Sequence, residues 1–431
     1  MSPEEPKQKE IMSRVACIIL AGGQGTRLFP LTQTRCKPSV CFGGRYRLID
    51  IPMSNSLNAH IERIFVISQY FASSLHQHIL ETYQLDYFRQ SKIQMLCPEE
   101  TPQRKSWFKG TADAVRQNLE HLETAPVDYF LILAGDQLYN INFTQMLSFA
   151  QKQDADLVIA SIPVEEKEAT RMGLLKIDSS NFIREFIEKP TDPQVLKKYA
   201  LPQEFLKGHS IVHPQETHYL ASMGIYIFKK QALFALLKEQ GDDFGKELIP
   251  LRLKKGKTAS YVYKGYWEDI GTIASYYNAN LALISQKNCL DTYDANNPIF
   301  THPHNLPSAL VHDTHVESSI IGQGTIIDAK EIVNSVIGIR ITINKGTIIR
   351  NCIILGTLFN EPPMVAASTP CCIGRNCRLE KAILDEHSSI GNDVQLINKN
   401  NLQTYDGDGI FIRDGIIIVT SGTHVPDGFI L

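Results

Sequence analysis

Short runs of aliphatic and β-branched residues alternate with amphipathic stretches over residues 15–290. Short runs of such residues predict buried strands, and an apolar stripe with a period near 3.6 predicts a helix. The strands are expected around Ile18–Leu20, Phe65–Ile67, Tyr129–Leu133 and Leu157–Ile159, and the helices over 111–122 and 143–153. The alternation predicts an α/β fold with a mostly parallel sheet that helices cover on both faces.

A different pattern begins near residue 319, where aliphatic residues recur every six positions. The series are Ile321, Ile327; Ile337, Ile343, Ile349; Val336, Thr342, Ile348, Ile354; and Leu384, Ile390, Leu396. A six-residue period is typical of a parallel β-helix, in which each coil stacks on the next and the aliphatic side chains form one core. A β-sandwich is the alternative, but it has no reason to keep this period. We expect the break at 357–370 to be a loop that leaves the coil.

Two further segments lack a regular pattern. Residues 1–14 begin with a polar run of mixed charge and predict a flexible tail. Residues 291–318 carry Pro298, Pro303 and Pro307 without a clear period, which predicts a linker. The expected domains are therefore 15–290 and 319–431.

Composition narrows the function classes. The net charge of −3 comes without a dense basic patch, which argues against binding of nucleic acid. The sequence contains no run of eighteen apolar residues, so no membrane-spanning helix is expected. The nine cysteines are scattered and odd in number, so a complete disulfide framework is not expected and a reducing, cytoplasmic location is favoured. The cluster Cys371, Cys372 and Cys377 lacks the spacing of a zinc site.

The strand around Ile18–Leu20 runs directly into the glycine-rich turn Ala21-Gly22-Gly23-Gln24-Gly25-Thr26-Arg27. Glycines can adopt positive φ and let backbone N–H groups approach phosphate oxygens, and an arginine adds a permanent positive charge. The spacing matches neither a P-loop nor a dinucleotide fingerprint. Lys37-Pro38 supplies a second cation. The turn therefore predicts a polyphosphate site rather than a simple tight turn.

Carboxylates and polar groups elsewhere could complete this site. Asp136 follows the strand that ends near Leu133, and Asp269 follows Trp267. Both could bind Mg²⁺, which often uses one or two carboxylates together with substrate phosphates, although each could instead cap a helix. The helix that starts at Gly110-Thr111 could attract ligand oxygens. Because no nucleophilic triad or zinc motif stands out, the set favours phosphoryl or nucleotidyl transfer.

Eight motifs occur together in the order found in one family: Leu20–Leu28, Lys37-Pro38, Trp107–Ala114, Leu133–Asp136, Glu188-Lys189-Pro190, Ala221–Tyr226, Asp243–Lys246 and Trp267–Thr272. From residue 15 to its end the chain resembles the glucose-1-phosphate adenylyltransferases, which are sugar nucleotidyltransferases. The resemblance implies a Rossmann-like nucleotidyltransferase domain followed by a left-handed parallel β-helix. It also implies that ATP and α-D-glucose 1-phosphate give ADP-glucose and pyrophosphate, with Mg²⁺ as the cofactor, at the committed step of glycogen or starch synthesis.

The same resemblance implies roles for individual residues. The catalytic residues would be Arg27, Lys37 and Asp136, and the metal ligands Asp136 and Asp269. ATP would contact Leu20, Ala21, Gly22, Gly23, Glu100, Gly110 and Thr111. Glucose 1-phosphate would contact Phe108, Gly173, Glu188, Lys189 and Ser222. Gln69 and Trp107 would couple an effector site to the active site.

The resemblance further implies a homotetramer that responds to an allosteric metabolite. Glu100 stands where many relatives have a glutamine that faces the base, and Gln137 stands where a histidine is common. Thr34, Arg350 and Glu386 lie at or near the places where relatives carry activator-binding lysines, so the effector stays open. Two alternatives also stay open: synthesis of another nucleotide sugar, and a non-catalytic regulatory subunit. The second would typically have lost the arginine or the lysine of the phosphate site, and Arg27 and Lys37 are both present.

Overall fold

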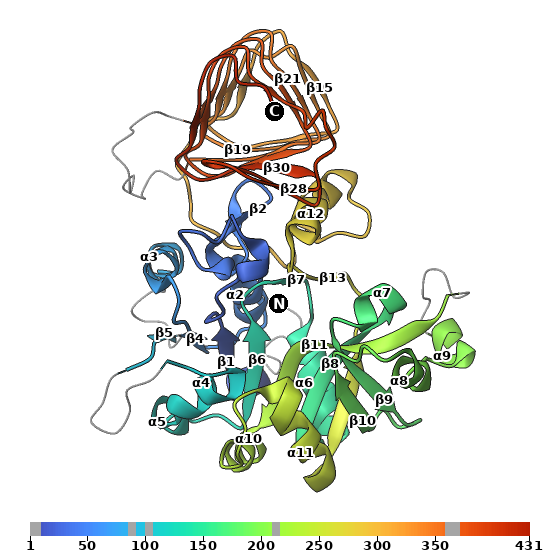
Figure 1. The fold of residues 1–431 in the computed structure, drawn as a ribbon. Helices are drawn as coiled ribbons and strands as arrows, with labels where there is room; N and C mark the ends of the chain where they lie inside the picture. The colour runs from blue at the N-terminus through green and yellow to red at the C-terminus, as the bar shows by residue number, and fades with distance from the viewer. Residues whose placement is uncertain (1–9, 85–91, 100–106, 209–215, 358–370) are drawn as a thin grey trace.

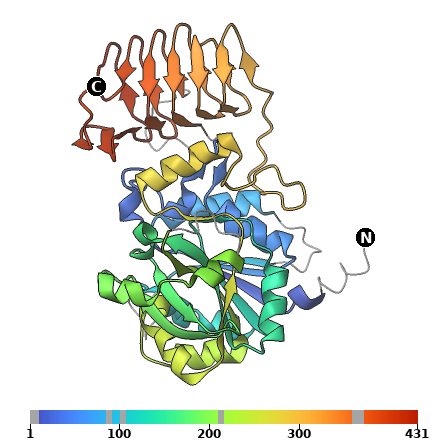
Figure 2. The ribbon, with the colours of Figure 1, turned by 90° about the vertical axis from the view of Figure 1, so that its right-hand side faces the viewer.

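The computed structural model describes residues 10–84, 92–99, 107–208, 216–357 and 371–431. An α/β part built on one large sheet lies below a coil of short parallel strands (Figure 1). Helix α12 (Ile273–Ser285) lies between the two parts and beneath the coil (Figure 2). In the described ranges, no helix is both long enough and apolar enough to span a membrane.

Strand β1 (Val15–Leu20) lies inside the large sheet, whose order is β10-β9-β11-β6-β1-β4-β5. It pairs in parallel with β4 and β6, so that Ile18 lies between Phe65 and Ile132. Since parallel strands end at the same edge, the turns after β1 and β6 meet there. The strands of this half are β4 (Arg63–Ile67), β5 (Lys92–Leu96) and β6 (Tyr129–Ala134).

The other half of the sheet contains antiparallel strands. The long strand β11 (His218–Lys229) runs antiparallel to β6, β8 and β9, and its pairing with β8 is interrupted between Ser222 and Tyr226. Such an interruption redirects the side chains around it. The remaining strands are β8 (Leu157–Glu165), β9 (Gly173–Ile177), β10 (Ile183–Glu188) and β12 (Thr258–Val262).

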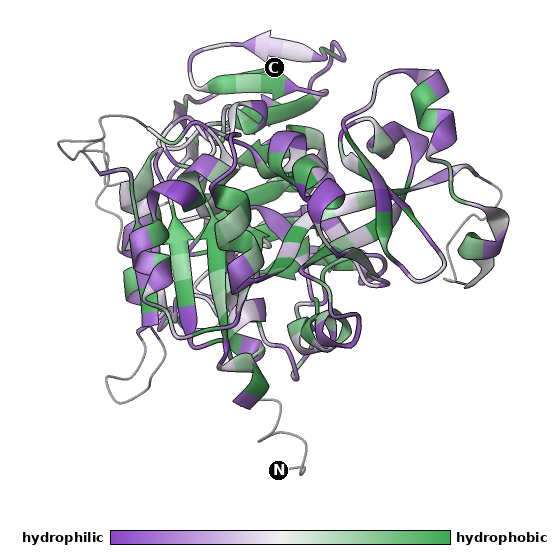
Figure 3. Cartoon of the chain, turned by 90° about the horizontal axis from the view of Figure 1, so that it is seen from below, coloured by the Kyte–Doolittle hydropathy of each residue, from purple (hydrophilic) through white to green (hydrophobic). Residues whose placement is uncertain are grey.

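Helices cover both faces of the sheet, as the alternating pattern predicts. Apolar residues of α2, α3 and α6 form one core with the sheet, and those of α4, α5, α10 and α11 form a second core on the opposite face. Apolar residues dominate the central strands, and polar residues are frequent on the surrounding helices (Figure 3). The helices are α2 (Asp50–Asn58), α3 (Ala72–Thr82), α4 (Thr111–Gln117), α5 (Leu119–Glu123), α6 (Phe143–Lys152), α7 (Glu166–Ala169), α8 (Pro193–Lys198), α9 (Gln203–Gly208), α10 (Lys230–Leu237) and α11 (Ile249–Lys255).

The C-terminal part is a parallel β-helix with three sheets, ordered β14-β17-β20-β23-β26-β31, β15-β18-β21-β24-β27 and β16-β19-β22-β25-β30. Ile327, Ile343, Ile373 and Ile390 form one ladder and are buried. Strands β28 and β29 extend the third sheet in antiparallel order. The strands are β14 (Leu310–Val311), β15 (His315–Glu317), β16 (Ile320–Ile321), β17 (Ile326–Ile327), β18 (Glu331–Val333), β19 (Val336–Ile339), β20 (Thr342–Ile343), β21 (Ile348–Arg350), β22 (Ile353–Gly356), β23 (Cys372–Ile373), β24 (Arg378–Glu380), β25 (Ala382–Leu384), β26 (Ser389–Ile390), β27 (Gln395–Leu396), β28 (Thr404–Asp406), β29 (Ile410–Arg413), β30 (Ile416–Val419) and β31 (His424–Val425).

The β-helix starts earlier than its sequence period indicates. Strands β14 and β15 pair in parallel with β17 and β18, although both lie in the segment 291–318 that the sequence presents as a linker. Leu310 and Val316 are exposed in this first coil, and so its aliphatic positions do not stand out as a core pattern. The expected loop at 357–370 falls almost wholly outside the described residues.

The two parts share a buried apolar cluster. Phe42 of β2 (Cys41–Phe42) and Tyr276 of α12 pack with Ile353, Ile383 and Ile418 of the β-helix. Strand β2 pairs with β3 (Tyr46–Arg47) in a short hairpin. The hydroxyl of Tyr277 donates a hydrogen bond to the carbonyl of Asn351 at 2.6 Å. The β-helix is therefore continuous with the core that supports the turn after β1.

Candidate active site

The turn after β1 is held in place by its own backbone and by the segment that carries Lys37. Gly25 has φ +65°, and a Cβ there would lie 3.0 Å from Cβ of Lys37 and 3.1 Å from Cγ2 of Thr32. The hydroxyl of Thr32 donates to the carbonyl of Gly25 at 3.0 Å. Gly25 therefore both permits the turn and lets the two segments approach closely. Gly22 and Gly23, in contrast, do not adopt positive φ.

Lys37 lies between two carboxylates. Its Nζ is 2.6 Å from Oδ2 of Asp136 and 3.7 Å from Oδ1 of Asp269. Burial lowers the pKa of Lys37, but Asp136 and Asp269 together outweigh that effect, and the pKa stands above its ordinary value. Burial and the neighbouring Asp136 raise the pKa of Asp269, while Lys37 and Arg27 oppose the rise. The site thus gathers opposite charges in a partly enclosed space.

A strand pair explains why two aspartates so far apart in sequence come together. Strand β7 (Gln137–Tyr139) directly follows Asp136, and it pairs in antiparallel order with β13 (Trp267–Asp269). Asp269 lies opposite Gln137 in this pair. Neither aspartate caps a helix, because Asp136 leads into a strand and Thr272 is the N-cap of α12. The alternative of two capping residues is therefore excluded.

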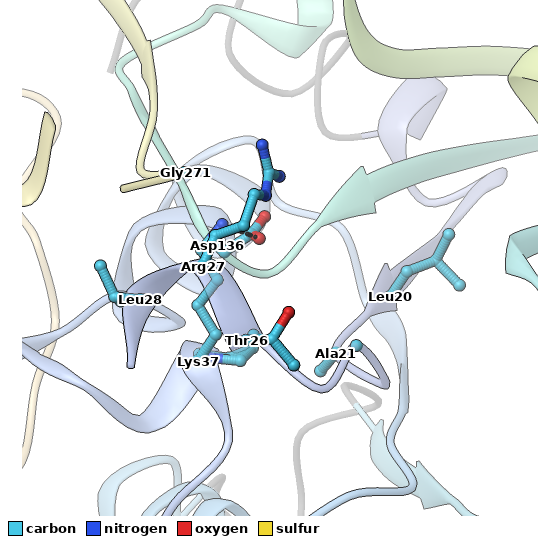
Figure 4. Close-up of a pocket in the computed structure, with 11 residues that line it drawn as sticks. Leu20, Ala21, Thr26, Arg27, Leu28, Lys37, Asp136 and Gly271 are labelled. Atoms are coloured by element: carbon cyan, nitrogen blue, oxygen red, sulfur yellow. Dashed lines mark ion pairs between the residues drawn. The ribbon is translucent and has the colours of Figure 1, made fainter. Parts of the chain in front are cut away.

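A hollow of about 200 Å³ opens between the turn and these charges. Arg27, Lys37 and Asp136 extend toward the same space in Figure 4, which also marks the Lys37–Asp136 ion pair. Arg27 is exposed and belongs to the short 3-10 helix Thr26–Leu28. The guanidinium of Arg27 lies close to the backbone of Gly271: a Cβ added to this glycine would be 3.5 Å from Nη1 of Arg27. The hollow therefore has two cations, a backbone turn and a carboxylate in its wall.

A larger cleft of about 590 Å³ adjoins the hollow and shares Leu20, Gly23 and Asp136 with it. Most of the site residues expected from the sequence line one cavity or the other. In the hollow are Leu20, Ala21, Gly23, Arg27, Lys37 and Asp136; in the cleft are Leu20, Gly22, Gly23, Gln69, Phe108, Gly110, Thr111, Asp136, Gly173, Glu188, Lys189, Ser222 and Asp269. The fold thus gathers segments from across the α/β part at the carboxyl edge of its sheet.

One end of the cleft is built around Glu188 at the end of β10. Glu188 is paired with Gly173 of β9, and a Cβ on Gly173 would lie 2.7 Å from Oε2 of Glu188. Burial raises the pKa of Glu188, and Lys189, whose Nζ is 3.6 Å from Oε1, opposes this rise. Ser222 lies where the pairing of β11 with β8 is interrupted, and its Oγ accepts from the N–H of Gly224. Hydroxyl-binding and charged groups therefore converge here.

Residues of the segments 67–70 and 108–111 also line the cleft. The amide of Gln69 accepts from the N–H of Phe108 at 2.9 Å and donates to its carbonyl at 3.4 Å. Next to this pair, Tyr70 and Trp107 stack with ring centroids 5.3 Å apart. Trp107 is 58% exposed and lies outside the lining of the cleft, whereas Tyr70 belongs to it.

At the start of α4, the N–H groups of Ala112 and Asp113 donate to the carbonyl of Asp242. The hydroxyl of Thr111 donates to Asp243. Gly110 and Thr111 line the cleft, and the attraction of ligand oxygens by this helix start stays a prediction. Glu100 lies outside the described residues.

The cleft also contains residues that the sequence did not single out as ligands. Arg171, Tyr226 and Asp243 belong to its lining. Asp243 caps the π-helix Phe244–Leu248 by accepting from the N–H of Lys246. Nearby glycines are the sequence feature that could have marked two of these residues as part of the cleft. Arg171 lies two residues before Gly173, and Asp243 lies two residues before Gly245.

The residues present are suited to a divalent cation of the Mg²⁺ type. Asp136 and Asp269 offer oxygen ligands around a shared positive charge, and Mg²⁺ commonly combines one or two carboxylates with waters and phosphates. No set of three or more His, Cys, Asp or Glu side chains arranged for a metal occurs in the part of the chain that the structure describes. Two carboxylates thus fit a metal that substrate phosphates also hold.

Comparison with known families agrees with both parts of the fold. A family model for nucleotidyl transferases matches residues 16–286. A second, for the GLGC left-handed parallel β-helix domain, matches residues 304–430 and gives the hand of the coil. Enzymes of the first family generally use divalent metal ions and act on nucleotide and sugar phosphate substrates. The chain therefore belongs to the nucleotidyl transferase family and has the architecture of a sugar nucleotidyltransferase.

Proposed function

We propose that this protein transfers the adenylyl group of ATP to α-D-glucose 1-phosphate and releases pyrophosphate and ADP-glucose. The observation that carries the proposal is Lys37, held between Asp136 and Asp269 beside a turn of backbone amides, with a second cation at Arg27. The adjoining cleft offers Glu188, Lys189 and Ser222 to a sugar phosphate. This arrangement supports nucleotidyl transfer to a phosphorylated sugar.

In the proposed complex the triphosphate lies along the turn Leu20–Gly23. Arg27 and Lys37 contact its oxygens, since both side chains border the hollow beside this turn. The adenosine extends toward Gly110 and Thr111, and the glucose toward Gly173, Glu188 and Ser222. The two cavities meet at Asp136, and so the reacting phosphates meet there as well.

The reaction exchanges one phosphoanhydride for another. A phosphate oxygen of glucose 1-phosphate attacks the α-phosphorus of ATP, and the bond from that phosphorus to the bridging oxygen of pyrophosphate breaks. Lys37 and Arg27 stabilise the negative charge that grows on the transferring group and on the leaving pyrophosphate. No side chain becomes covalently modified. Positioning and charge stabilisation supply the catalysis.

Asp136 and Asp269 would hold Mg²⁺, which when bound would neutralise phosphate charge. Lys37 also carries positive charge beside both aspartates, with which it forms ion pairs. The two aspartates thus fix the position of the Lys37 ammonium group beside the turn that would hold the phosphates.

Adenine and glucose specificity, together with biological role, are part of the same proposal. The string Trp107-Phe108-Lys109-Gly110-Thr111-Ala112-Asp113-Ala114 and the GLGC-type β-helix support an adenylyltransferase among the sugar nucleotidyltransferases. We further propose a cytoplasmic homotetramer that supplies glycogen or starch synthesis and responds to an allosteric metabolite. Gln69 and Trp107 would couple the effector to the active site, because Gln69 fixes Phe108 in the cleft wall.

A pyrophosphate-release assay tests the proposal. The purified chain is given glucose 1-phosphate and Mg²⁺ with ATP, UTP, dTTP or GTP in turn. We expect release with ATP at a kcat/KM at least tenfold above the other nucleotides. A preference for UTP, dTTP or GTP would replace the adenylyl proposal with synthesis of another nucleotide sugar. If none of the four nucleotides gives pyrophosphate release with glucose 1-phosphate, the result would support a non-catalytic subunit. Light scattering of the same sample tests the tetramer.

A further inference from the structure

A buried charge cluster joins the α/β part to the β-helix two residues from Lys37. Nη2 of Arg35 is 3.0 Å from Oδ2 of Asp385, and its Nη1 donates to Oε2 of Glu386. The Arg35 side chain is 7% exposed, and those of Asp385 and Glu386 are 3% and 2% exposed. Both carboxylates follow strand β25 of the β-helix. Buried ion pairs of this kind are rare and tolerate little displacement.

Glu386 contacts the chain on both sides of Lys37. One carboxylate oxygen accepts from Arg35, and the other accepts from the thiol of Cys41 at 3.1 Å. Lys37 lies between these two residues in sequence, so a single β-helix side chain fixes both ends of the segment that carries it. The N–H of Glu386 donates to Oδ1 of Asp385, which orients the pair of carboxylates.

The segment between the two anchors has little freedom. Residues Lys37–Ser39 form a 3-10 turn in which the N–H of Val40 donates to the carbonyl of Lys37 at 3.1 Å. The guanidinium of Arg47 donates to the carbonyl of Ser39 at 2.5 Å. The hydroxyl of Tyr276 donates to the carbonyl of Cys41, also at 2.5 Å. Pro38 restricts the backbone further. A displacement at either anchor would therefore reach Lys37.

The charges of the cluster are maintained in the fold. Burial raises the pKa of Glu386, but Arg35 and Arg47 lower it by more, and the pKa stands below its ordinary value. Glu386 is thus a carboxylate that faces Arg35 at neutral pH.

We propose that Arg35 and Glu386 are positioning residues of this enzyme: their contact across the two parts of the chain holds Lys37 where it can act on the transferring phosphate. The β-helix then contributes directly to the rate through this contact. The inference rests on the proposed function at one point, the role of Lys37 in catalysis.

Steady-state kinetics of the full chain test the proposal through Glu386→Gln, which keeps the size of the side chain and removes its charge. We expect kcat to fall roughly 10- to 100-fold while the KM for glucose 1-phosphate stays within about twofold. The matched control is Glu331→Gln, which breaks the Arg350–Glu331 ion pair within the β-helix, where Nε and Oε1 are 2.6 Å apart. This control should keep the kcat of the wild type.

A double variant separates positioning from simple loss of structure. If Glu386 acts through Lys37, then Glu386→Gln added to Lys37→Ala should change kcat by less than about twofold. A further loss as large as in the single variant would overturn the proposal. A kcat in Glu386→Gln equal to that of the wild type would overturn it as well. If the unmodified protein makes no nucleotide sugar at all, that result refutes the proposed function instead.

A milder substitution keeps the proposal testable if Glu386→Gln does not fold. Cys41→Ala removes only the second contact to Glu386 and leaves the ion pair with Arg35. We expect it to melt within a few degrees of the wild type and to lower kcat by less than Glu386→Gln. Should Glu386→Gln fail to fold, an unchanged kcat in both Cys41→Ala and Arg35→Lys would count against the positioning role.

Discussion

Asp269 lies directly opposite Gln137 in the β7–β13 strand pair, which places its carboxylate beside that of Asp136. Lys37 lies between the two carboxylates and carries their counter-charge. Three segments that are distant in sequence thus meet at one point.

Replacement of Lys37 by alanine should lower kcat by roughly 10²–10³, because one preorganised cation is lost from the transition state. The measurement is pyrophosphate release at saturating ATP and glucose 1-phosphate. Lys176→Ala is the control, since Lys176 is exposed and pairs with Glu185 away from the site. A rate near that of the wild type in Lys37→Ala would contradict the role given to this lysine.

Replacement of Asp269 by asparagine should raise the Mg²⁺ concentration needed for half-maximal activity by roughly 10- to 100-fold. The reason is that one of two charged oxygen ligands is lost. Removal of Mg²⁺ with a chelator should abolish activity in the wild type and leave its far-UV circular dichroism unchanged. Activity that survives the chelator would exclude a metal at Asp136 and Asp269.

Replacement of Gly173 by alanine should raise the KM for glucose 1-phosphate roughly tenfold or more. The new Cβ would lie 2.5 Å from Cζ of Phe186 and 2.7 Å from Oε2 of Glu188, so Glu188 must move. The KM for ATP should stay close to that of the wild type. Equal changes in both constants would show that Gly173 does not belong to the sugar end.

Asp385 should make stability depend on pH between about 4 and 6. Burial, assisted by Glu386 and opposed by Arg35, raises the pKa of Asp385 to about 6. Between the ordinary value near 3.8 and this value the folded protein binds more protons than the unfolded chain, and so this residue's contribution falls as pH rises. The Tm of Asp385→Asn minus that of the wild type should therefore increase from pH 4 to pH 7, by about 2–5 °C. A difference that stays constant over this range would contradict the assignment.

Truncation of Ile383 to alanine should destabilise the protein by about 2–5 kcal/mol, because this fully buried side chain packs in the cluster that both parts share. Denaturant unfolding followed by intrinsic fluorescence measures the loss. Ile326→Ala is the matched control, since Ile326 is 48% exposed. If the two variants lose stability equally, the shared cluster does not hold the parts together.

Periodicity predicted the two architectures well because both the alternating α/β pattern and the six-residue repeat are local. It could not give the direction of β11, whose antiparallel pairing with β6 and β8 depends on distant strands. It also missed β14 and β15, because the side chains of Leu310 and Val316 in this outer coil face solvent and leave no core signal.

The site was predictable where a motif carries the chemistry, as for the turn before Arg27 and for Lys37. The chemistry of the site suggested that Asp136 and Asp269 come together, but their approach depends on the pairing of β7 with β13. At the start of α4 the carbonyl of Asp242 accepts from the N–H groups of Ala112 and Asp113, a contact that no local pattern records. Arg35 and Glu386 belong to no motif that marks their contact across 351 positions.

That separation has a consequence for biosynthesis. Arg35 is synthesised before Glu386, so a nascent chain that has not yet reached Glu386 lacks the contact between them. Under the proposed positioning role, the segment that carries Lys37 gains its second anchor only after Glu386 has emerged.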